Sequence, residues 1–289
     1  MPTLSLNSKE LSDVAQTGML TFYCHVIESQ HPDPILVDEK AVEISRQLNP
    51  VFEKSSSKLL RNLAKGKVKE ELVVHIALRA KKYDEYARSF LTRNSSGSLV
   101  NLGCGMDSRF FRVDNGRMIC FDLDLPEMIE FKKKFYKETD RYHFIAASVF
   151  DYTWMDQVEK MGKGPILFMA EGLLMYLEPR KVRELILTLQ SRFPGSELVC
   201  EVVTEFFTRK PWNNMVALKM NTQLGVGKDA AFTFGIKNKR EMEAWHSGIE
   251  FMDDWSYFDT KHPRLGWVGI MGRSGLMRGV QYTVHYRLN

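Results

Sequence analysis

The feature that most constrains the fold of this chain is an alternation of short apolar runs with helical segments beyond residue 97. The apolar runs read LVNLGCG, RMICFDLDLP, HFIAASVF, PILFMAEGLLMYL and SELVCEVV, and the helical segments read PEMIEFKKKFYKE, TWMDQVEKM and EPRKVRELILTLQSRF. Near-continuous apolar strands separated by amphipathic helices indicate βαβ units and a parallel sheet covered on both faces. The tail GVQYTVHYRL alternates apolar and polar residues, which predicts a late antiparallel strand at or near an edge.

The first part of the chain predicts helices instead of strands. In KEELVVHIALRAKKYDEYARSFL, apolar residues recur at three- and four-residue steps from Leu72 to Leu91. The small polar run RNSSGS, residues 93–98, then interrupts this pattern. We therefore predict an N-terminal helical extension over residues 1–93 and an α/β domain over residues 94–289.

Residues 204–262 fit the alternation poorly and are rich in aromatic side chains. An insertion that follows the carboxyl end of a strand in an open α/β sheet lies over the ligand crevice. We interpret this segment as a helical, aromatic substrate cap. A peripheral subdomain with its own small core is the alternative.

Composition and charge narrow the class of protein. Of the 289 residues, 44% are hydrophobic and 26% are charged, and the formal net charge is +4, as in ordinary soluble globular proteins. The basic runs KGKVK (65–69) and KKK (132–134) are short and lie among acids. We interpret them as solvated helix faces, because a nucleic-acid site concentrates its basic residues on one stripe or patch.

Targeting and cysteine patterns predict a cytoplasmic protein. The N-terminus lacks a signal-peptide pattern, and no apolar run approaches the length of a membrane span. The four cysteines form no CxxC pair and the seven histidines are scattered, which predicts neither a disulfide framework nor a metal site. We expect no membrane partner. Monomer and homodimer both remain open.

Two glycines mark the turn after the first apolar run. Gly103 and Gly105 fall where the first strand of the sheet meets its helix, and glycine there permits a tight turn and close approach of a ligand. A dinucleotide-binding GxGxxG would need a third glycine at position 108, but the residue is Ser108. The sequence therefore offers weaker support for a ligand with a pyrophosphate, such as a dinucleotide.

Acidic residues follow two later strands. Asp122 and Asp124 lie about twenty residues after the glycines, where a carboxylate can accept both hydroxyls of a ribose. NAD and S-adenosylmethionine both carry such a ribose. Glu171 ends the fourth strand, and carboxyl ends of parallel strands face one crevice. Gly103, Gly105, Asp124 and Glu171 can therefore converge on one cationic ligand.

Three segments, taken in order, resemble one family. LVNLGCGMDSRFFR, FDLDLPEMIEFKK and AEGLLMYL are similar to segments of the leucine carboxyl methyltransferase family, which includes polyketide O-methyltransferases of the tetracenomycin type. VIESQHPDPILVDEKA and LRAKKYDEY extend the resemblance into the N-terminal half. The resemblance implies a Rossmann-like class I methyltransferase fold that binds S-adenosylmethionine and releases S-adenosylhomocysteine. It also implies that the N-terminal extension contributes to the cofactor and substrate site.

The resemblance also implies roles for single residues at the sugar and methionyl ends of the cofactor. Arg79 would reach the methionyl carboxylate, and Gly103 would let the cofactor lie against the turn. Asp124 would hold the ribose hydroxyls with Asp122 nearby, although either aspartate could instead cap the following helix. Glu171 would face the methionyl end.

At the adenine end the chain departs from the family. The family often has Asp-Leu where this chain has Ser148 and Val149. Val149 can pack on the adenine ring, but Ser148 cannot supply a carboxylate to the exocyclic amine. His25 stands where family members usually carry an arginine.

The expected chemistry is methyl transfer to oxygen by in-line displacement, on a small hydrophobic, polyketide-like or acyl substrate. A carboxylate acceptor is already ionised and needs alignment and desolvation, for which Arg109 and Tyr176 are candidates. Arg109 and Arg112 could anchor an acidic substrate or could lie on the helix surface, and Tyr176 could be a core residue. A phenol or alcohol acceptor would need a base, such as a histidine. A nicotinamide-dependent oxidoreductase and a non-catalytic nucleoside-binding protein are the remaining alternatives.

Overall fold

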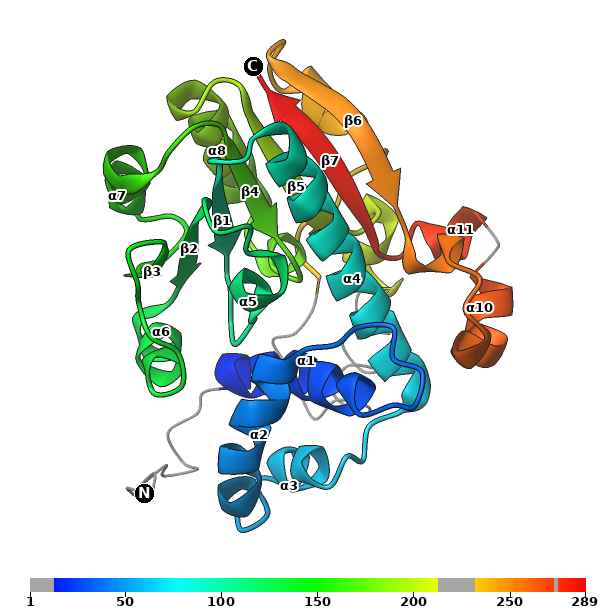
Figure 1. Cartoon of the computed structure of the whole chain (residues 1–289). Coiled ribbons are helices and arrows are strands. Elements are labelled where there is room, and N and C mark those ends of the chain that lie inside the picture. The colour runs from blue at the N-terminus through cyan, green and yellow to red at the C-terminus, as the bar shows by residue number, and fades with distance from the viewer. Residues whose placement is uncertain (1–12, 213–231, 273–274) are drawn as a thin grey trace.

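A single seven-stranded sheet organises the chain (Figure 1). The computed structural model describes residues 13–212, 232–272 and 275–289. The strand order is β3-β2-β1-β4-β5-β7-β6, and β7 runs antiparallel to both of its neighbours. The strands are β1 (Ser98–Leu102), β2 (Ile119–Asp124), β3 (Tyr142–Ala146), β4 (Ile166–Ala170), β5 (Ser196–Val202), β6 (Ile249–Trp255) and β7 (Tyr282–Leu288). This order confirms the predicted Rossmann-like class I methyltransferase sheet and the late antiparallel strand.

Helices precede the sheet and connect its parallel strands. They are α1 (Asp13–Ser29), α2 (Glu39–Phe52), α3 (Lys58–Ala64), α4 (Glu70–Arg93), α5 (Arg109–Val113), α6 (Pro126–Lys133), α7 (Thr153–Met161), α8 (Pro179–Arg192), α10 (Gly266–Met271) and α11 (Gly275–Arg278). Short 3-10 turns are η1 (Leu174–Tyr176), η2 (Glu205–Thr208), η3 (Glu241–Ala244), η4 (Tyr257–Asp259) and η5 (Pro263–Leu265). Pro126 and Pro179 occupy the first turn of α6 and α8, where a missing N–H costs nothing. The predicted switch from helices to strands falls at the end of α4.

Each face of the sheet packs against its own layer of helices. Alternate strand residues such as Leu99 and Leu167 join side chains of α1 to α6 in one core. Their neighbours Val100 and Phe168 join α7 and α8 in another. Every position of β1 and β5 is buried, as expected for strands covered on both faces, and the polar side chains Asn101, Glu197 and Glu201 all have partners there. The helices α1, α2 and α3 lie beyond the end of the sheet (Figure 1).

The predicted cap includes part of the sheet. Residues 249–255 form the edge strand β6, which pairs with β7, so this portion of the 204–262 range is strand rather than cap. Phe234 and Trp245 pack into the core shared with α8. Residues 213–231 lie outside the described residues, and the cap remains a prediction.

One basic run is not the solvated face that we predicted. Lys132 is fully buried, and its Nζ lies 2.6 Å from Oδ2 of Asp122 and donates to the carbonyl oxygen of Asp107. Lys133 and Lys134 are exposed, as are Lys65, Lys67 and Lys69. All four cysteines are buried and free. In the described part of the chain, no helix is both long and apolar enough to span a membrane.

Candidate active site

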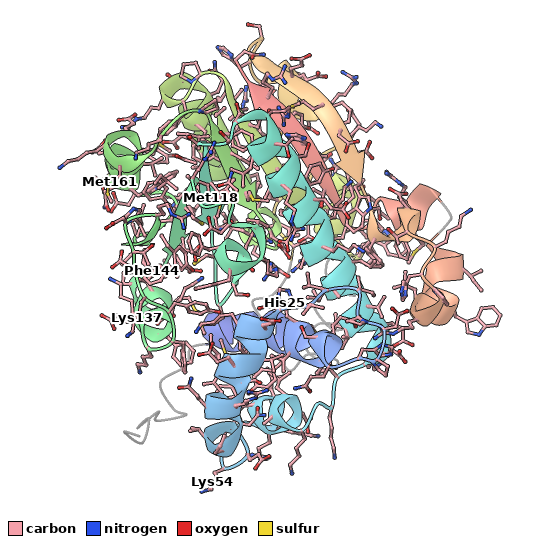
Figure 2. All side chains as sticks on the ribbon, in the orientation of Figure 1. His25, Lys54, Met118, Lys137, Phe144 and Met161 are labelled. Carbon is pink, nitrogen blue, oxygen red and sulfur yellow. The ribbon has the colours of Figure 1, made fainter. Side chains whose placement is uncertain are left out.

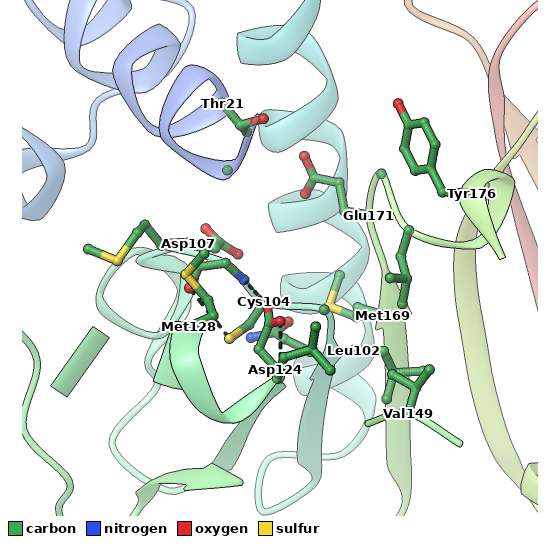
Figure 3. A pocket seen from close by; sticks show the side chains of 18 of the residues that line it. Thr21, Leu102, Cys104, Asp107, Asp124, Met128, Val149, Met169, Glu171 and Tyr176 are labelled. Carbon is green, nitrogen blue, oxygen red and sulfur yellow. Dashed lines mark hydrogen bonds between the residues drawn. The ribbon is translucent and has the colours of Figure 1, made fainter. Parts of the chain in front are cut away.

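A cavity of about 540 Å³ lies at the carboxyl ends of the parallel strands. Its walls come from α1, from the ends of β1, β2 and β4, and from the loops that follow these strands. Figure 3 shows Thr21, Asp107, Asp124 and Glu171 directed toward the same space from these elements. This volume is within the usual range for small-molecule sites.

The glycine turn requires glycine for two different reasons. Gly103 and Gly105 have φ values of +65° and +49°, which other residues adopt only at a cost. A Cβ on Gly103 would come within 2.9 Å of Cδ1 of Leu173. A Cβ on Gly105 would meet nothing within 4 Å. Both glycines line the cavity, so the turn brings bare backbone to any ligand there.

The two aspartates of β2 have different surroundings. Asp124 lines the cavity, and its Oδ2 accepts from the backbone N–H of Gly105 at 2.7 Å. Burial raises the pKa of Asp124 despite this bond. Asp122 is outside the cavity lining; its carboxylate accepts from Asn101 and Tyr142 and pairs with Lys132. The expectation that Asp122 assists at the ribose is therefore not supported, because its oxygens already serve a buried ion pair.

Glu171 and Arg79 meet at the end of β4, as the resemblance implies. Nε of Arg79 donates to Oε1 of Glu171 at 2.8 Å, and Nη1 donates to Oε2 of Glu201 at 3.0 Å. Nη2 of Arg79 has no partner among the described residues. Burial opposes ionisation of Glu171, but Arg79 and Arg109 hold its pKa below the ordinary value. Arg79 thus has one nitrogen available to a ligand carboxylate.

Arg109 is buried at the wall of the cavity and does not lie on the helix surface. It is 2% exposed, and its guanidinium pairs with Asp84 at 3.1 Å, Asp107 at 2.6 Å and Glu171 at 2.5 Å. The same guanidinium donates to Oδ1 of Asn101. Because each nitrogen of Arg109 already contacts another side chain, a role as substrate anchor would have to share these contacts, and that role stays a prediction.

Arg112 corrects the sequence analysis in the same way. Its guanidinium bonds to Asp38, Asp84 and Asp107, and the residue is outside the cavity lining. Arg112 therefore does not lie on the helix surface, and it does not line the cavity in which a substrate would bind. Arg112 instead links α2 and α4 to the loop after β1.

These contacts form one buried network with an excess of negative charge. Three guanidinium groups contact five carboxylates, which belong to Asp38, Asp84, Asp107, Glu171 and Glu201. Burial raises the pKa of Glu201, so it is the member that most easily takes a proton. A ligand with a sulfonium and an ammonium group fits this charge excess, and the free Nη2 of Arg79 fits its carboxylate.

The remaining predicted residues also line the cavity. Ser148 and Val149 follow β3 and lie on its wall. Tyr176 belongs to η1, and its ring lies 5.7 Å from that of Phe232. Burial, with a smaller effect from Glu201, raises the pKa of Tyr176 to about 12. The structure therefore places Tyr176 at the cavity rather than only in the core.

One wall of the cavity comes from α1, of which the sequence analysis singled out only His25. Gly18, Thr21, Phe22 and His25 line it from α1. Their spacing of three and four residues is the signal that could have revealed this face. His25 also bonds through Nδ1 to Oδ2 of Asp38 at 3.0 Å. Within residues 13–212, 232–272 and 275–289, no cluster of three metal-binding side chains is found.

Comparison with known proteins agrees with this geometry. A family model described as leucine carboxyl methyltransferase matches residues 19–190. The tetracenomycin polyketide synthesis O-methyltransferase TcmP of Streptomyces glaucescens is 30% identical over 270 residues, covering 91% of this chain and 92% of that protein. An S-adenosyl-L-methionine-dependent methyltransferase of Gibberella zeae is 22% identical over 317 residues, covering 97% of this chain and 99% of that protein.

A solved structure shares the fold. The crystal structure of a DUF574 family protein from Streptomyces avermitilis superposes with a TM-score of 0.57 at 12% identity, covering 85% of this chain and 97% of that one. The family match and the Streptomyces glaucescens relative show that this chain is an S-adenosylmethionine-dependent methyltransferase and belongs to the leucine carboxyl methyltransferase family.

Proposed function

We propose that the protein transfers a methyl group to a carboxylate oxygen of a small, largely apolar acceptor. The observation that carries this proposal is the convergence of the glycine turn, Asp124 and Glu171 on one cavity whose remaining wall is mainly apolar. The description of the family as leucine carboxyl methyltransferase supports a carboxylate. The name of the Streptomyces glaucescens relative supports an oxygen acceptor and a polyketide-like substrate. Family membership removes the nicotinamide-dependent oxidoreductase from consideration.

The cofactor supplies the methyl group on a positively charged sulfur. Asp124 would accept hydrogen bonds from the ribose hydroxyls beside the Gly105 backbone. Val149 would pack on the adenine ring, with the Ser148 hydroxyl beside it. Nη2 of Arg79 would donate to the methionyl carboxylate. Glu171 and the charge excess behind it would favour the cationic end.

The acceptor would lie on the side of Tyr176. A carboxylate is ionised at neutral pH, so it needs no base; the site must align it and exclude water. Because the pKa of Tyr176 is raised to about 12, its hydroxyl stays protonated and can donate to an acceptor carboxylate. Leu173 and Leu177 add apolar surface to the same cavity. We propose a cytoplasmic protein acting on a free small molecule.

Incubation with a labelled methyl donor and a panel of naphthoic acids and naphthols tests the proposal. We expect labelled methyl esters from the acids. Tyr176→Phe removes one neutral hydrogen bond, worth about 0.5–1.5 kcal/mol, so KM for the acid should rise by roughly two- to tenfold. Labelling of naphthols alone would reject the carboxylate acceptor.

A further inference from the structure

His25 has one ring nitrogen with a partner and one without. The side chain is 3% exposed, and its Nδ1 lies 3.0 Å from Oδ2 of Asp38. In the part of the chain that the structure describes, four buried side-chain atoms lack a hydrogen-bond partner, and only Nε2 of His25 belongs to a residue that lines the cavity. Figure 2 labels His25 where α1 meets the rest of the domain. A buried, unpartnered polar atom at a cavity indicates a contact made by a ligand.

The surroundings of Asp38 fix the direction of its bond to His25. Oδ2 of Asp38 also accepts from Ser108 Oγ at 2.5 Å and from Nη1 of Arg112 at 2.7 Å, and Oδ1 accepts from the backbone N–H of Ala41 at 2.9 Å. Although burial opposes ionisation, these contacts hold the pKa of Asp38 well below its ordinary value. An ionised carboxylate only accepts hydrogen bonds. Nδ1 of His25 therefore carries a hydrogen, so the neutral tautomer that fits here has its lone pair on Nε2.

An imidazole oriented in this way can act as a base. Asp38 holds the tautomer and would stabilise the imidazolium that forms when Nε2 takes a proton. A carboxylate acceptor makes no use of such a base, because it has no proton to lose. A hydroxyl acceptor does.

The cavity that His25 lines favours an aromatic hydroxyl. Phe22 lies one turn before His25 on the same face of α1, and Met106 and Met128 also line the cavity. Aromatic rings and methionine sulfur pack favourably on an aromatic ligand. Phenols are also more acidic than alcohols, so they transfer a proton to imidazole more readily.

We propose that this site methylates phenols as well as carboxylates, with His25 as the catalytic base and Asp38 as its positioning residue. The inference rests on the proposed function for the place of the acceptor. In the step, the phenol O–H bond breaks and its proton moves to Nε2 of His25. The phenol oxygen bonds to the methyl carbon while the carbon–sulfur bond breaks, leaving its electron pair on sulfur as a neutral thioether. The imidazolium then returns its proton to water.

His25→Asn tests the proposal, because asparagine keeps a donor toward Asp38 and removes the base. Thr21→Val, on the same face of α1, is the matched control. Three acceptors are compared: a naphthol, the naphthoic acid of the same ring system, and an electron-poor nitrophenol that is already ionised at the assay pH. Calorimetric titration with S-adenosylhomocysteine measures cofactor binding separately from activity.

For His25→Asn, we expect kcat/KM to fall about 100-fold or more for the naphthol. It should change by less than about threefold for the naphthoic acid and the nitrophenol, since neither has a proton to lose. The affinity for S-adenosylhomocysteine should stay within about twofold, and Thr21→Val should affect all three acceptors alike.

The other outcomes distinguish failure of this inference from failure of the proposed function. Equal losses on all three acceptors, or a tenfold weaker binding of S-adenosylhomocysteine, would assign His25 to cofactor binding. If the unmodified protein methylated no naphthol, the proposed activity on phenols would be rejected. Methylation of naphthols but no acid would reject the carboxylate acceptor and leave the role of His25 standing.

Discussion

Two ionic clusters lie at opposite ends of the parallel strands, and they differ in charge balance. At the carboxyl end, three guanidinium groups contact five carboxylates, and several of these residues line the cavity. At the amino end, the single carboxylate of Glu197 accepts two bonds from Arg93, at 2.7 and 3.0 Å, and lies 2.9 Å from Nε2 of His285. None of these three residues is in the cavity lining.

The comparison separates a binding cluster from a structural one. The cluster at the amino end surrounds its one carboxylate with Arg93, His285 and, at 4.0 Å, Arg287, and ties α4 and β7 to β5. The cluster at the carboxyl end keeps an excess of negative charge and an unpartnered Nη2 on Arg79. A cluster that is incomplete without a ligand, and that opens to a cavity, is where ligand binding is expected.

The largest expected effect on stability comes from a substitution in the carboxyl-end cluster at Asp84, which does not line the cavity. Asp84 is 1% exposed and bonds to both Arg109 and Arg112. Asp84→Asn removes the one charge that both buried guanidinium groups share, while each keeps two other carboxylates, so the free energy of unfolding should fall by about 1.5–3 kcal/mol. Urea unfolding measures this. The neighbouring exposed Glu85→Gln is the control and should change it by less than about 0.5 kcal/mol. Equal effects would show that the network adds nothing.

A second pair of variants separates binding from stability on one strand. Asp124→Asn should weaken S-adenosylhomocysteine roughly ten- to hundredfold, because a hydrogen bond to a charged group is worth about 1.5–3 kcal/mol. Its unfolding midpoint should change little. Asp122→Asn should instead destabilise the fold, because Lys132 is left unpaired, and the folded protein should bind the ligand normally. Calorimetry measures the binding and urea unfolding measures the stability of both variants. If Asp122→Asn weakened binding and Asp124→Asn weakened stability, the ribose would lie at Asp122.

Asp122 and Asp124 also show how much of the site could be predicted from the sequence. The parallel strands were predictable because burial on both faces leaves continuous apolar runs. The positions of Gly103, Asp124 and Glu171 were predictable because strand ends converge. Asp122 and Asp124 lie on the same side of β2, so side-chain alternation could not separate them. What separates them is Lys132, which reaches Asp122 from α6.

The buried network was beyond local patterns for the same reason. Arg109 and Arg112 lie on a helix of five residues, and their partners Asp38 and Asp84 come from α2 and α4. Periodicity within one helix says nothing of contacts so distant in the chain. The edge strand β6 was missed because its acids, Asp253 and Asp254, interrupt the apolar pattern of residues 249–255.

The smallest expected effect lies at the amino-end cluster. Burial alone would raise the pKa of Glu197, but the larger combined effect of His285 and Arg93 lowers it from 4.5 to about 2. A depressed pKa means that the contribution to stability is complete above about 4.5 and is lost as the pH falls toward about 2. Because the Arg93 side chain is 45% exposed, solvent screening limits the effect of Glu197→Gln at neutral pH to about 1 kcal/mol.

Urea unfolding of Glu197→Gln at neutral pH and near pH 3 tests the sign. The difference from the unmodified protein should shrink as the pH falls, because a protonated Glu197 resembles the glutamine that replaces it. The exposed Glu250→Gln on β6 is the control and should show no such trend. Methyl transfer and binding of S-adenosylhomocysteine should be unchanged, since Glu197 is remote from the cavity. If Glu197→Gln weakened ligand binding as Asp124→Asn does, the two clusters would be one system and the contrast between them would be wrong.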